Sequence, residues 1–327
     1  MNLFRKIAQK PRPKKLGLAL GSGGARGWAH LGVLRLLDEM GVRPDVIAGT
    51  SIGAIVAAAY ACRRSEALEY IADTSDWRDL AKLFGEVGLH RSGLLTGRKI
   101  EKFLRGLYPV DNIEDAQIPL ALVATDLRNA KDVVLTRGPL IPAVRASMSI
   151  PGLFTPVRLD GAYLVDGAMT NPVPVSAARA LGADVVIAVD VNLAPGMGVF
   201  QGEPEPPETE LPVPAQKAPS GLKRARKWVE ETYEHVRDMP QAALDSARRY
   251  IAKPTGAPTL IDILLQTTRL AENQMTHANL VESPPDMLIQ PAVGSVMTLD
   301  FMLAHEGIDA GSEAAKAKRA EIEALLG

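Results

Sequence analysis

The sequence has a single cysteine and a net charge close to zero. Cys62 is the one cysteine, which excludes an intrachain disulfide and is typical of a protein in a reducing compartment. The 37 basic residues are balanced by 38 acidic ones, so the composition does not indicate a nucleic-acid-binding surface, and no nucleic-acid partner is expected. No acidic loop with EF-hand spacing occurs either, and we expect neither a metal nor a cofactor.

Long hydrophobic runs are missing as well. The apolar stretch that begins at Ala54 stops at Arg63, far short of the roughly 20 residues that cross a membrane. The first 15 residues carry six basic and no acidic side chains, as a signal peptide begins, but the apolar run after them, 16–20, is too short to continue one. We therefore predict a cytoplasmic protein without signal peptide or transmembrane segment, and leave peripheral membrane association open.

Short apolar runs alternate with helical patterns, which predicts βαβ units and a largely parallel sheet, hence an α/β fold. A proline-rich, acidic stretch after Asn192 interrupts this order. We expect four parts: a basic N-terminal tail (1–15), an α/β core (16–193), a linker with an amphipathic helical insertion (194–257), and C-terminal helices with one strand that complete the core domain (258–327). A closing helix is predicted over 299–326.

A serine stands where a predicted strand passes into a predicted helix. Gly49-Thr50-Ser51-Ile52-Gly53 matches G-x-S-x-G in the context of a nucleophile elbow. The small residues Gly49 and Gly53 allow a tight turn that lifts the Ser51 hydroxyl above the sheet, near the positive end of the helix. The alternative is an ordinary βα loop in which Ser51 caps the helix.

A glycine-rich segment, 21–27, lies at the first strand-to-helix junction. Its uncovered backbone N–H groups form an anion nest. A phosphate-binding P-loop needs Gly-Lys-Ser/Thr, which is missing, and a dinucleotide site needs an acid at the end of the next strand, which is also missing. The third interpretation is an oxyanion hole beside Ser51. Arg26 within this segment could form an ion pair with a carboxylate, hold the loop in shape or meet a substrate phosphate.

Two kinds of base could serve Ser51. His277 and His305 stand late enough for the Ser…Asp…His order of a conventional α/β-hydrolase triad, but each lies within a helical pattern. His30 is expected as a helix-surface or core residue. Among carboxylates, Asp160 begins the Asp-Gly turn of a predicted hairpin, whereas Asp166 ends that hairpin's second strand and can point into a cleft. Asp166 is therefore the candidate base.

Three motifs occur together in this chain: Gly23–Gly27, Gly49–Gly53 and Asp166–Ala168. In this order and in these strand contexts they resemble the motifs of the patatin-like phospholipases, specifically the bacterial group similar to the esterase domain of neuropathy target esterase. The resemblance covers about residues 16–193 and continues more softly over 262–309.

The resemblance implies a three-layer α/β/α fold with a mostly parallel central sheet. It also implies hydrolysis of phospholipid or lysophospholipid acyl esters by a dyad without histidine, with Ser51 as nucleophile and Asp166 as base. Gly49 and Gly53 would shape the elbow. The oxyanion hole would come from the backbone of Gly23, Gly24, Ala25, Arg26 and Gly27.

An enzyme of this kind must reach lipid, and two basic segments could attach it to an anionic membrane surface: the tail and residues 222–236. A homodimer formed through the apolar helix at 258–280 stays open. Two other functions also stay open, namely the histidine triad named above and a non-catalytic module that binds lipid or an anion in the glycine nest.

Overall fold

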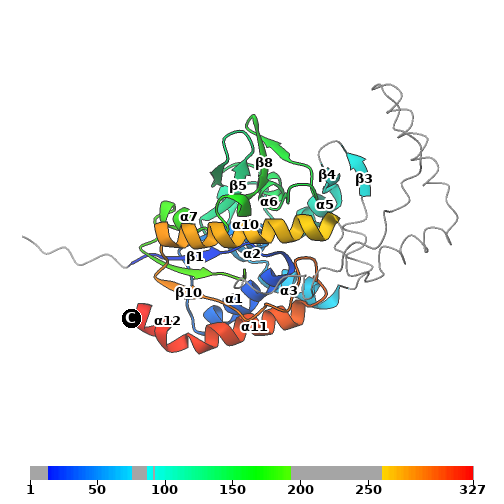
Figure 1. Ribbon diagram of the computed structural model, residues 1–327. Helices are drawn as coiled ribbons and strands as arrows, with labels where there is room; N and C mark the ends of the chain where they lie inside the picture. Colours follow the sequence, from blue (N-terminus) through cyan, green and yellow to red (C-terminus); the bar gives the residue numbers. More distant parts are fainter. Residues whose placement is uncertain (1–13, 76–86, 91–92, 193–259, 327) are drawn as a thin grey trace, which may run out of the picture. The chain divides into compact units, whose positions relative to one another are not determined.

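The structure is a computed structural model that describes residues 14–75, 87–90, 93–192 and 260–326 (Figure 1). The chain divides into two compact units, Met1–Met197 with Leu264–Gly327 and Gly198–Ile263. All described residues except 260–263 belong to the first unit. The predictions for residues 222–236, for the linker and insertion at 194–257 and for most of the basic tail lie outside the described residues.

A central sheet of eight strands is present among the described residues, in the order β10-β9-β1-β2-β5-β8-β7, with β6 also paired to β5. The first five strands of this order run parallel to one another, and β6, β8 and β7 form antiparallel pairs. The predicted α/β fold with a mostly parallel sheet is therefore confirmed. The strands are β1 (Leu16–Leu20), β2 (Val46–Thr50), β5 (Leu120–Asp126), β6 (Lys131–Leu135), β7 (Val157–Leu159), β8 (Ala162–Asp166), β9 (Val185–Val189) and β10 (Met287–Ile289), while β3 (Val87–His90) and β4 (Gly93–Leu95) pair separately.

Helices cover both faces of the sheet because successive strand residues point to opposite sides. In β1, Leu18 and Leu20 join the larger core, whereas Ala19 joins a second core of small side chains. The helices on the larger core are α1 (Ala29–Glu39), α2 (Ile52–Ala61), α3 (Ser65–Thr74), α5 (Arg98–Leu107), α6 (Leu140–Ser147), α11 (Ala304–Ala317) and α12 (Arg319–Leu326). The second core is covered by α7 (Val175–Ala180) and contacted by α10 (Leu260–Glu282) through Leu280.

The C-terminal part of the chain packs on the beginning of the core (Figure 1). A side chain at Gly32 of α1 would meet the backbone of Ile308, and one at Gly311 of α11 would meet the backbone of Ala29. The two helices are therefore in backbone contact, which glycine alone permits at both positions. This contact places the segment before α11 next to the glycine-rich segment.

The predicted closing helix begins later than expected, at Ala304 instead of Leu299, and it breaks at Lys318 into α11 and α12. The physical reason lies in the segment Val296–Phe301, whose carbonyls are bound elsewhere. Those of Val296, Thr298 and Phe301 accept hydrogen bonds from Arg26, Ala25 and Trp28, respectively. These three donors belong to the short 3₁₀ helix η1 (Gly24–Trp28), and similar short turns are η2 (Ile113–Asp115) and η3 (Gly167–Met169).

The predicted hairpin is present as β7 and β8. Its turn residues Asp160 and Gly161 have φ of 48° and 81°, as a tight Asp-Gly hairpin turn requires. Asp160 is thus a turn residue, and Asp166 ends β8 opposite Ala124 of β5, next to Val123, opposite which β2 ends at Thr50.

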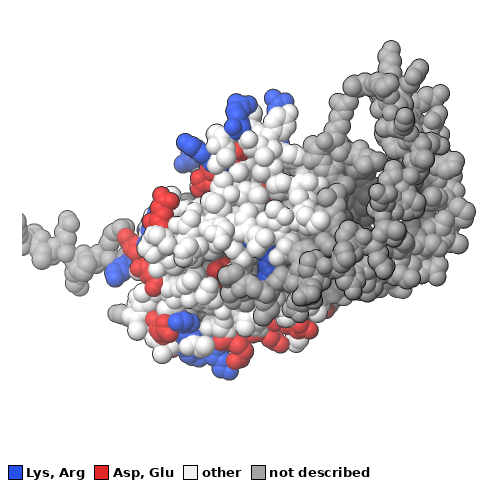
Figure 2. Space-filling view, in the orientation of Figure 1, with Lys and Arg blue, Asp and Glu red and all other residues white. Residues whose placement is uncertain are grey.

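The face that carries α10 in Figure 1 is mostly uncharged at its centre. Figure 2 shows the described Lys, Arg, Asp and Glu side chains gathered toward the borders of this face, with other residues over its middle. Its charged side chains therefore form no continuous patch of one sign over α10.

Candidate active site

Ser51 lies between β2 and α2 in a strained backbone conformation. Its φ of 57° and ψ of −120° are rarely adopted by a residue with a side chain, and such a conformation costs on the order of 1–3 kcal/mol. Two sets of hydrogen bonds hold it: the Ser51 N–H donates to Ser147 Oγ at 2.9 Å, and the Ser51 carbonyl accepts from Ala54 and Ile55 at the start of α2. The sharp turn is therefore determined by surrounding structure.

Gly49 and Gly53 leave room for the tight turn because they lack side chains, not because their own backbone is strained. Neither has a positive φ, so the strain of the elbow rests on Ser51 itself. A side chain at Gly49 would strike the Gly53 carbonyl, and one at Gly53 would strike the Leu20 carbonyl. Glycine is required at both positions because the start of α2 lies directly against β1 and β2.

Asp166 meets Ser51 where the ends of β8 and β2 face each other along β5. The Ser51 hydroxyl donates to Asp166 Oδ2 at 2.7 Å, and the Ala168 N–H donates to Asp166 Oδ1 at 2.9 Å. The backbone of Asp166 is fixed as well, because its N–H donates to the Ser149 carbonyl and its carbonyl accepts from Thr125 Oγ1. The carboxylate is thus held with one oxygen on the serine.

Burial makes this carboxylate a stronger base than usual. Asp166 is 2% exposed, and the loss of water raises its pKa from 3.8 to about 7, although the hydrogen bonds from Ala168 and Ser51 act in the opposite direction. A carboxyl group with a pKa near 7 is substantially ionised at neutral pH and accepts a proton more readily than an ordinary carboxylate.

The glycine-rich segment lies beside the elbow. Gly27 makes this possible, since a side chain there would overlap Ile52, the residue after Ser51. Gly23 and Gly24 have φ of 152° and 58°, and within the described residues their N–H groups have no backbone acceptor. The Ala25 N–H instead donates to the Thr298 carbonyl at 2.9 Å. In this conformation the backbone N–H groups of Gly23 and Gly24 are the ones in the segment that are available to donate to a bound group.

Arg26 is fully buried and binds backbone and amide oxygens rather than a carboxylate. Its Nε donates to the Val191 carbonyl at 3.1 Å, Nη1 to the Val296 carbonyl at 3.3 Å and Nη2 to Asn192 Oδ1 at 2.9 Å. Burial, followed by the charge of Arg269, lowers the pKa of Arg26 to about 10, so it stays charged at neutral pH. Of the three roles considered for Arg26, holding the loop in shape is the one that these contacts describe.

The histidines whose side chains the structure describes do not approach this pair. His30 is buried and its Nε2 donates to the Gly21 carbonyl at 2.8 Å; burial lowers its pKa to about 4, so it is neutral. His277 is exposed on α10, and His305 is exposed and faces Asp309 at 3.6 Å. The side chains of the other two histidines are outside the described part of the chain. The geometry gives the triad alternative no support.

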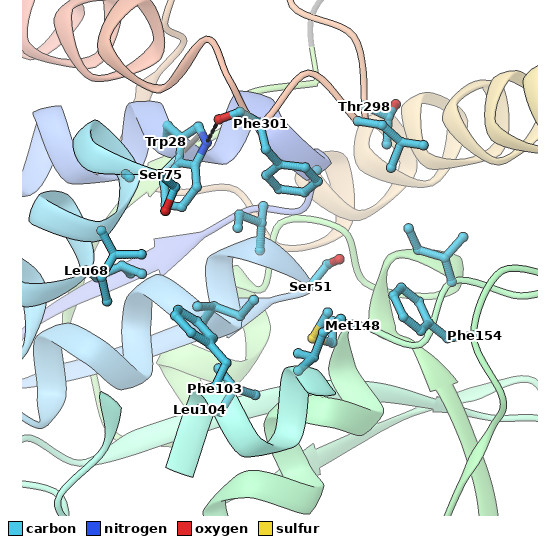
Figure 3. Close-up of a pocket in the computed structure, with 18 of the residues that line it drawn as sticks. Trp28, Ser51, Leu68, Ser75, Phe103, Leu104, Met148, Phe154, Thr298 and Phe301 are labelled. Carbon is cyan, nitrogen blue, oxygen red and sulfur yellow. Dashed lines mark hydrogen bonds between the residues drawn. The ribbon is translucent and has the colours of Figure 1, made fainter. Parts of the chain in front are cut away.

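An apolar pocket opens at Ser51 (Figure 3). Phe103, Leu104 and Leu68 lie on one side of the serine, and Phe154 and Met148 on the other, while the ring of Phe301 approaches from the opposite wall. Polar side chains are few among the lining residues, which are Gly24, Trp28, Ser51, Ile52, Ile55, Leu68, Ile71, Ala72, Ser75, Ile100, Phe103, Leu104, Met148, Ile150, Leu153, Phe154, Thr298, Leu299 and Phe301. A pocket of this kind suits a hydrocarbon chain attached to a group that reacts at Ser51.

Some residues of this site were not predicted from the sequence. Ser147 accepts from the Ser51 N–H and donates to the Val123 carbonyl at 2.6 Å, yet a serine near the end of a helix has no pattern that points to this role. Glu272 on α10 is buried, and burial followed by the charge of Asp166 raises its pKa to about 8. Only the three-dimensional path of α10 brings it near Asp166.

Two wider features of the described residues bear on the function. None of their helices is both long and apolar enough to cross a membrane. The described His, Cys, Asp and Glu residues also form no group of three that could hold a metal ion.

Comparison with known proteins decides the family. The family described as patatin-like phospholipase matches residues 18–179. An uncharacterized NTE family protein of Mycobacterium tuberculosis is 30% identical over an alignment of 321 residues that covers 91% of this chain and 89% of that protein. The chain belongs to the patatin-like phospholipase family. The resemblance seen in the sequence motifs is confirmed.

Longer relatives share a part of this patatin-like protein. The mouse patatin-like phospholipase domain-containing protein 7 is 36% identical over an alignment of 195 residues that covers 58% of this chain and 14% of the mouse protein. The lysophospholipase NTE1 of Pyricularia oryzae is 33% identical over 200 residues, covering 58% and 13% of the two chains. Among solved structures, VipD of Legionella pneumophila aligns at 15% identity with a TM-score of 0.40, over 94% of this chain and 67% of that one.

Proposed function

We propose that this protein is a serine hydrolase of lipid acyl esters, with phospholipids or lysophospholipids as substrates, and that it works through a Ser51–Asp166 dyad. The single observation that carries the proposal is the 2.7 Å hydrogen bond from the Ser51 hydroxyl to Asp166, at the mouth of an apolar pocket. Membership of the patatin-like phospholipase family and the similarity to the fungal lysophospholipase NTE1 support the lipid substrate.

The first half of the reaction acylates the enzyme. Asp166 takes the proton of Ser51 as the serine oxygen attacks the carbonyl carbon of the ester, and the carbonyl oxygen becomes an oxyanion. The N–H groups of Gly23 and Gly24 donate to this oxyanion, while the Ala25 N–H, expected from the sequence to join them, is bound to the Thr298 carbonyl. The intermediate collapses, Asp166 returns the proton to the departing alcohol, and the acyl group remains on Ser51.

The second half releases the acid. Asp166 takes a proton from water, whose oxygen attacks the acyl carbon, and the same amides hold the second oxyanion. Ser51 leaves with the proton from Asp166, so one ester and one water give one fatty acid and one alcohol. The raised pKa of Asp166 suits both roles, because the group must accept and return a proton near neutral pH.

Arg26 and Gly27 are part of the proposed oxyanion hole as positioning residues. Arg26 fixes the segment through three hydrogen bonds, and Gly27 lets it approach Ile52. The Gly23 and Gly24 amides ahead of them donate to the oxyanion. Loss of one such donor typically lowers a rate by about 100-fold to 1,000-fold.

The experiment is lipid hydrolysis by purified protein, followed by identification of the released fatty acids. A panel of phospholipids and lysophospholipids is compared for wild type, Ser51→Ala and the double variant His277→Asn/His305→Asn. The proposal expects release by wild type and the histidine variant and none by Ser51→Ala. Release that survives Ser51→Ala, or that is lost in the histidine variant, would overturn the dyad. A non-catalytic module would release nothing in any of the three.

Membrane attachment through the basic tail or residues 222–236, and a homodimer, remain part of the proposal as inferred from the sequence. The tail is tested by liposome binding of a protein lacking residues 1–14. Equal binding would remove the tail from the proposal.

A further inference from the structure

The segment Val296–Leu303 has some side chains that line the apolar pocket and others that are exposed on the surface. Thr298, Leu299 and Phe301 line the apolar pocket. Met297 and Met302 do not line it and are 42% and 49% exposed. Large apolar side chains thus stand on the outside of the same short segment that walls the pocket from within.

The segment is held in this position by its contacts with η1. Arg26 donates to the Val296 carbonyl, Ala25 to the Thr298 carbonyl, and Trp28 Nε1 to the Phe301 carbonyl at 3.3 Å (Figure 3). The ring of Phe301 also packs edge-to-face on Trp28, with 6.2 Å between ring centroids. Because Val296, Thr298 and Phe301 are bound to η1, Met297 lies between two anchored residues and Met302 directly follows a third.

The charge of the segment indicates which kind of lipid surface it can contact. Asp300 is its one charged residue, and its Oδ2 already accepts from the Met297 N–H at 2.9 Å. A segment with no basic residue and exposed methionines is not suited to an anionic surface, but methionine side chains partition favourably into the apolar layer of a lipid aggregate.

We propose that Val296–Leu303 is a lipid-contacting segment that inserts Met297 and Met302 into a neutral or zwitterionic lipid surface, next to the pocket that receives the acyl chain. This inference rests on the proposed function, and it names the surface from which the substrate enters. The exposed methionines and the pocket-lining residues belong to the same segment. A lipid chain can therefore pass from the lipid surface into the pocket at Ser51 without entering water.

The test measures binding without hydrolysis, so its failure is distinct from failure of the proposed function. Full-length Ser51→Ala protein is mixed with phosphatidylcholine vesicles at about 0.5 M salt, which screens contacts made by basic segments. Adding Met297→Gln and Met302→Gln is expected to lower the partition coefficient by about tenfold to 100-fold, given the hydrophobic gain of two methionines. The matched control, Leu127→Gln/Val134→Gln, changes two exposed apolar residues away from the pocket and is expected to bind as the parent does.

A second variant reports insertion directly. Met302→Trp is expected to strengthen vesicle binding, since tryptophan favours the membrane interface, and to show a blue shift of its added fluorescence when vesicles are present. Three results would each overturn the inference: a parent that does not bind these vesicles, a methionine variant that binds like its control, or an added tryptophan whose emission does not move. Methionine changes that instead abolish self-association in sedimentation would also overturn it, in favour of a second copy of the chain.

Discussion

The Ser51 hydroxyl and the Asp166 carboxylate lie 2.7 Å apart although the residues are separated by 115 positions in the chain. β2 and β8 pair with the same side of β5, opposite β6, and their ends meet at Val123 and Ala124 of β5, which brings the two side chains together. Because the sheet fixes both backbones, this distance depends on few side-chain rotations.

Ser147→Ala is expected to lower kcat by about tenfold while KM changes by less than twofold. Without Ser147 Oγ the buried Ser51 N–H loses its acceptor, which costs about 1–3 kcal/mol and loosens the strained elbow. Steady-state kinetics and thermal unfolding measure the two effects. Ser149→Ala is the control, because Ser149 is equally buried but its hydroxyl contacts Arg145. An equal fall of kcat in both variants would contradict a positioning role for Ser147.

Gly24→Ala is expected to reduce kcat by about 100-fold or more. The residue has φ of 58°, and a side chain there would also strike the Thr298 carbonyl, so the amides that face the oxyanion must shift. Gly41→Ala is the matched control, since Gly41 has φ of 72° but open space around it. That variant should lose only about 1–2 kcal/mol of stability and keep its kcat. Similar kcat values for the two variants would argue against the glycine segment as an oxyanion hole.

Ala72→Leu is expected to shorten the preferred acyl chain. Ala72 lines the pocket, and three added carbons occupy space otherwise open to the substrate. Each methylene that can no longer be buried costs about 0.8 kcal/mol, so kcat/KM should fall about fourfold per lost carbon for long chains and stay constant for four-carbon esters. Ala67→Leu, on the same helix but outside the pocket lining, should leave the chain-length profile unchanged. The profile is measured with a series of esters.

Glu272→Gln is expected to stabilise the fold increasingly as pH rises. Burial raises the pKa of Glu272 from 4.5 to about 8, so the folded protein binds this proton more tightly than the unfolded chain does. The contribution of Glu272 to stability is therefore present below about pH 4.5 and is lost as pH rises toward 8, by on the order of 1 kcal/mol per pH unit. Urea unfolding at pH 5 and pH 8 measures the free energy of unfolding of variant and wild type. Taking the difference between the two proteins removes the contribution of His30, whose lowered pKa makes stability rise with pH in both of them. Glu282→Gln, an exposed change on the same helix, is the control. A variant whose advantage is the same at both pH values would show that Glu272 is not a buried acid.

The sequence was sufficient for features that local chemistry determines. The G-x-S-x-G turn, the Asp-Gly hairpin and the alternation of strands and helices each depend on neighbouring residues, and the α/β sheet, the hairpin turn at Asp160 and the family followed from them. The contact of Gly53 with the Leu20 carbonyl could not be predicted, because close packing between β1 and α2 cannot be read from one segment.

Contacts between distant segments could not be foreseen. Residues 299–303 have a helical pattern, yet hydrogen bonds from η1, some 270 positions earlier, hold this part of the chain out of the helix. The partners of Arg26 are carbonyls that face it only after folding. Ser147 and Glu272 reach the dyad for the same reason, since each lies on a helix whose position is set by the whole core.

The most direct test of the account is the rate at which a fluorophosphonate labels Ser51, measured from pH 5 to pH 9 with the modified residue identified by mass spectrometry. For wild type the rate should rise with pH as Asp166 ionises, pass its midpoint near pH 7 and then level off. Asp166→Asn should be slower by about 1,000-fold or more, with no such midpoint, and His277→Asn/His305→Asn should match wild type. Labelling of Asp166→Asn at the wild-type rate would contradict the central claim that this carboxylate activates Ser51.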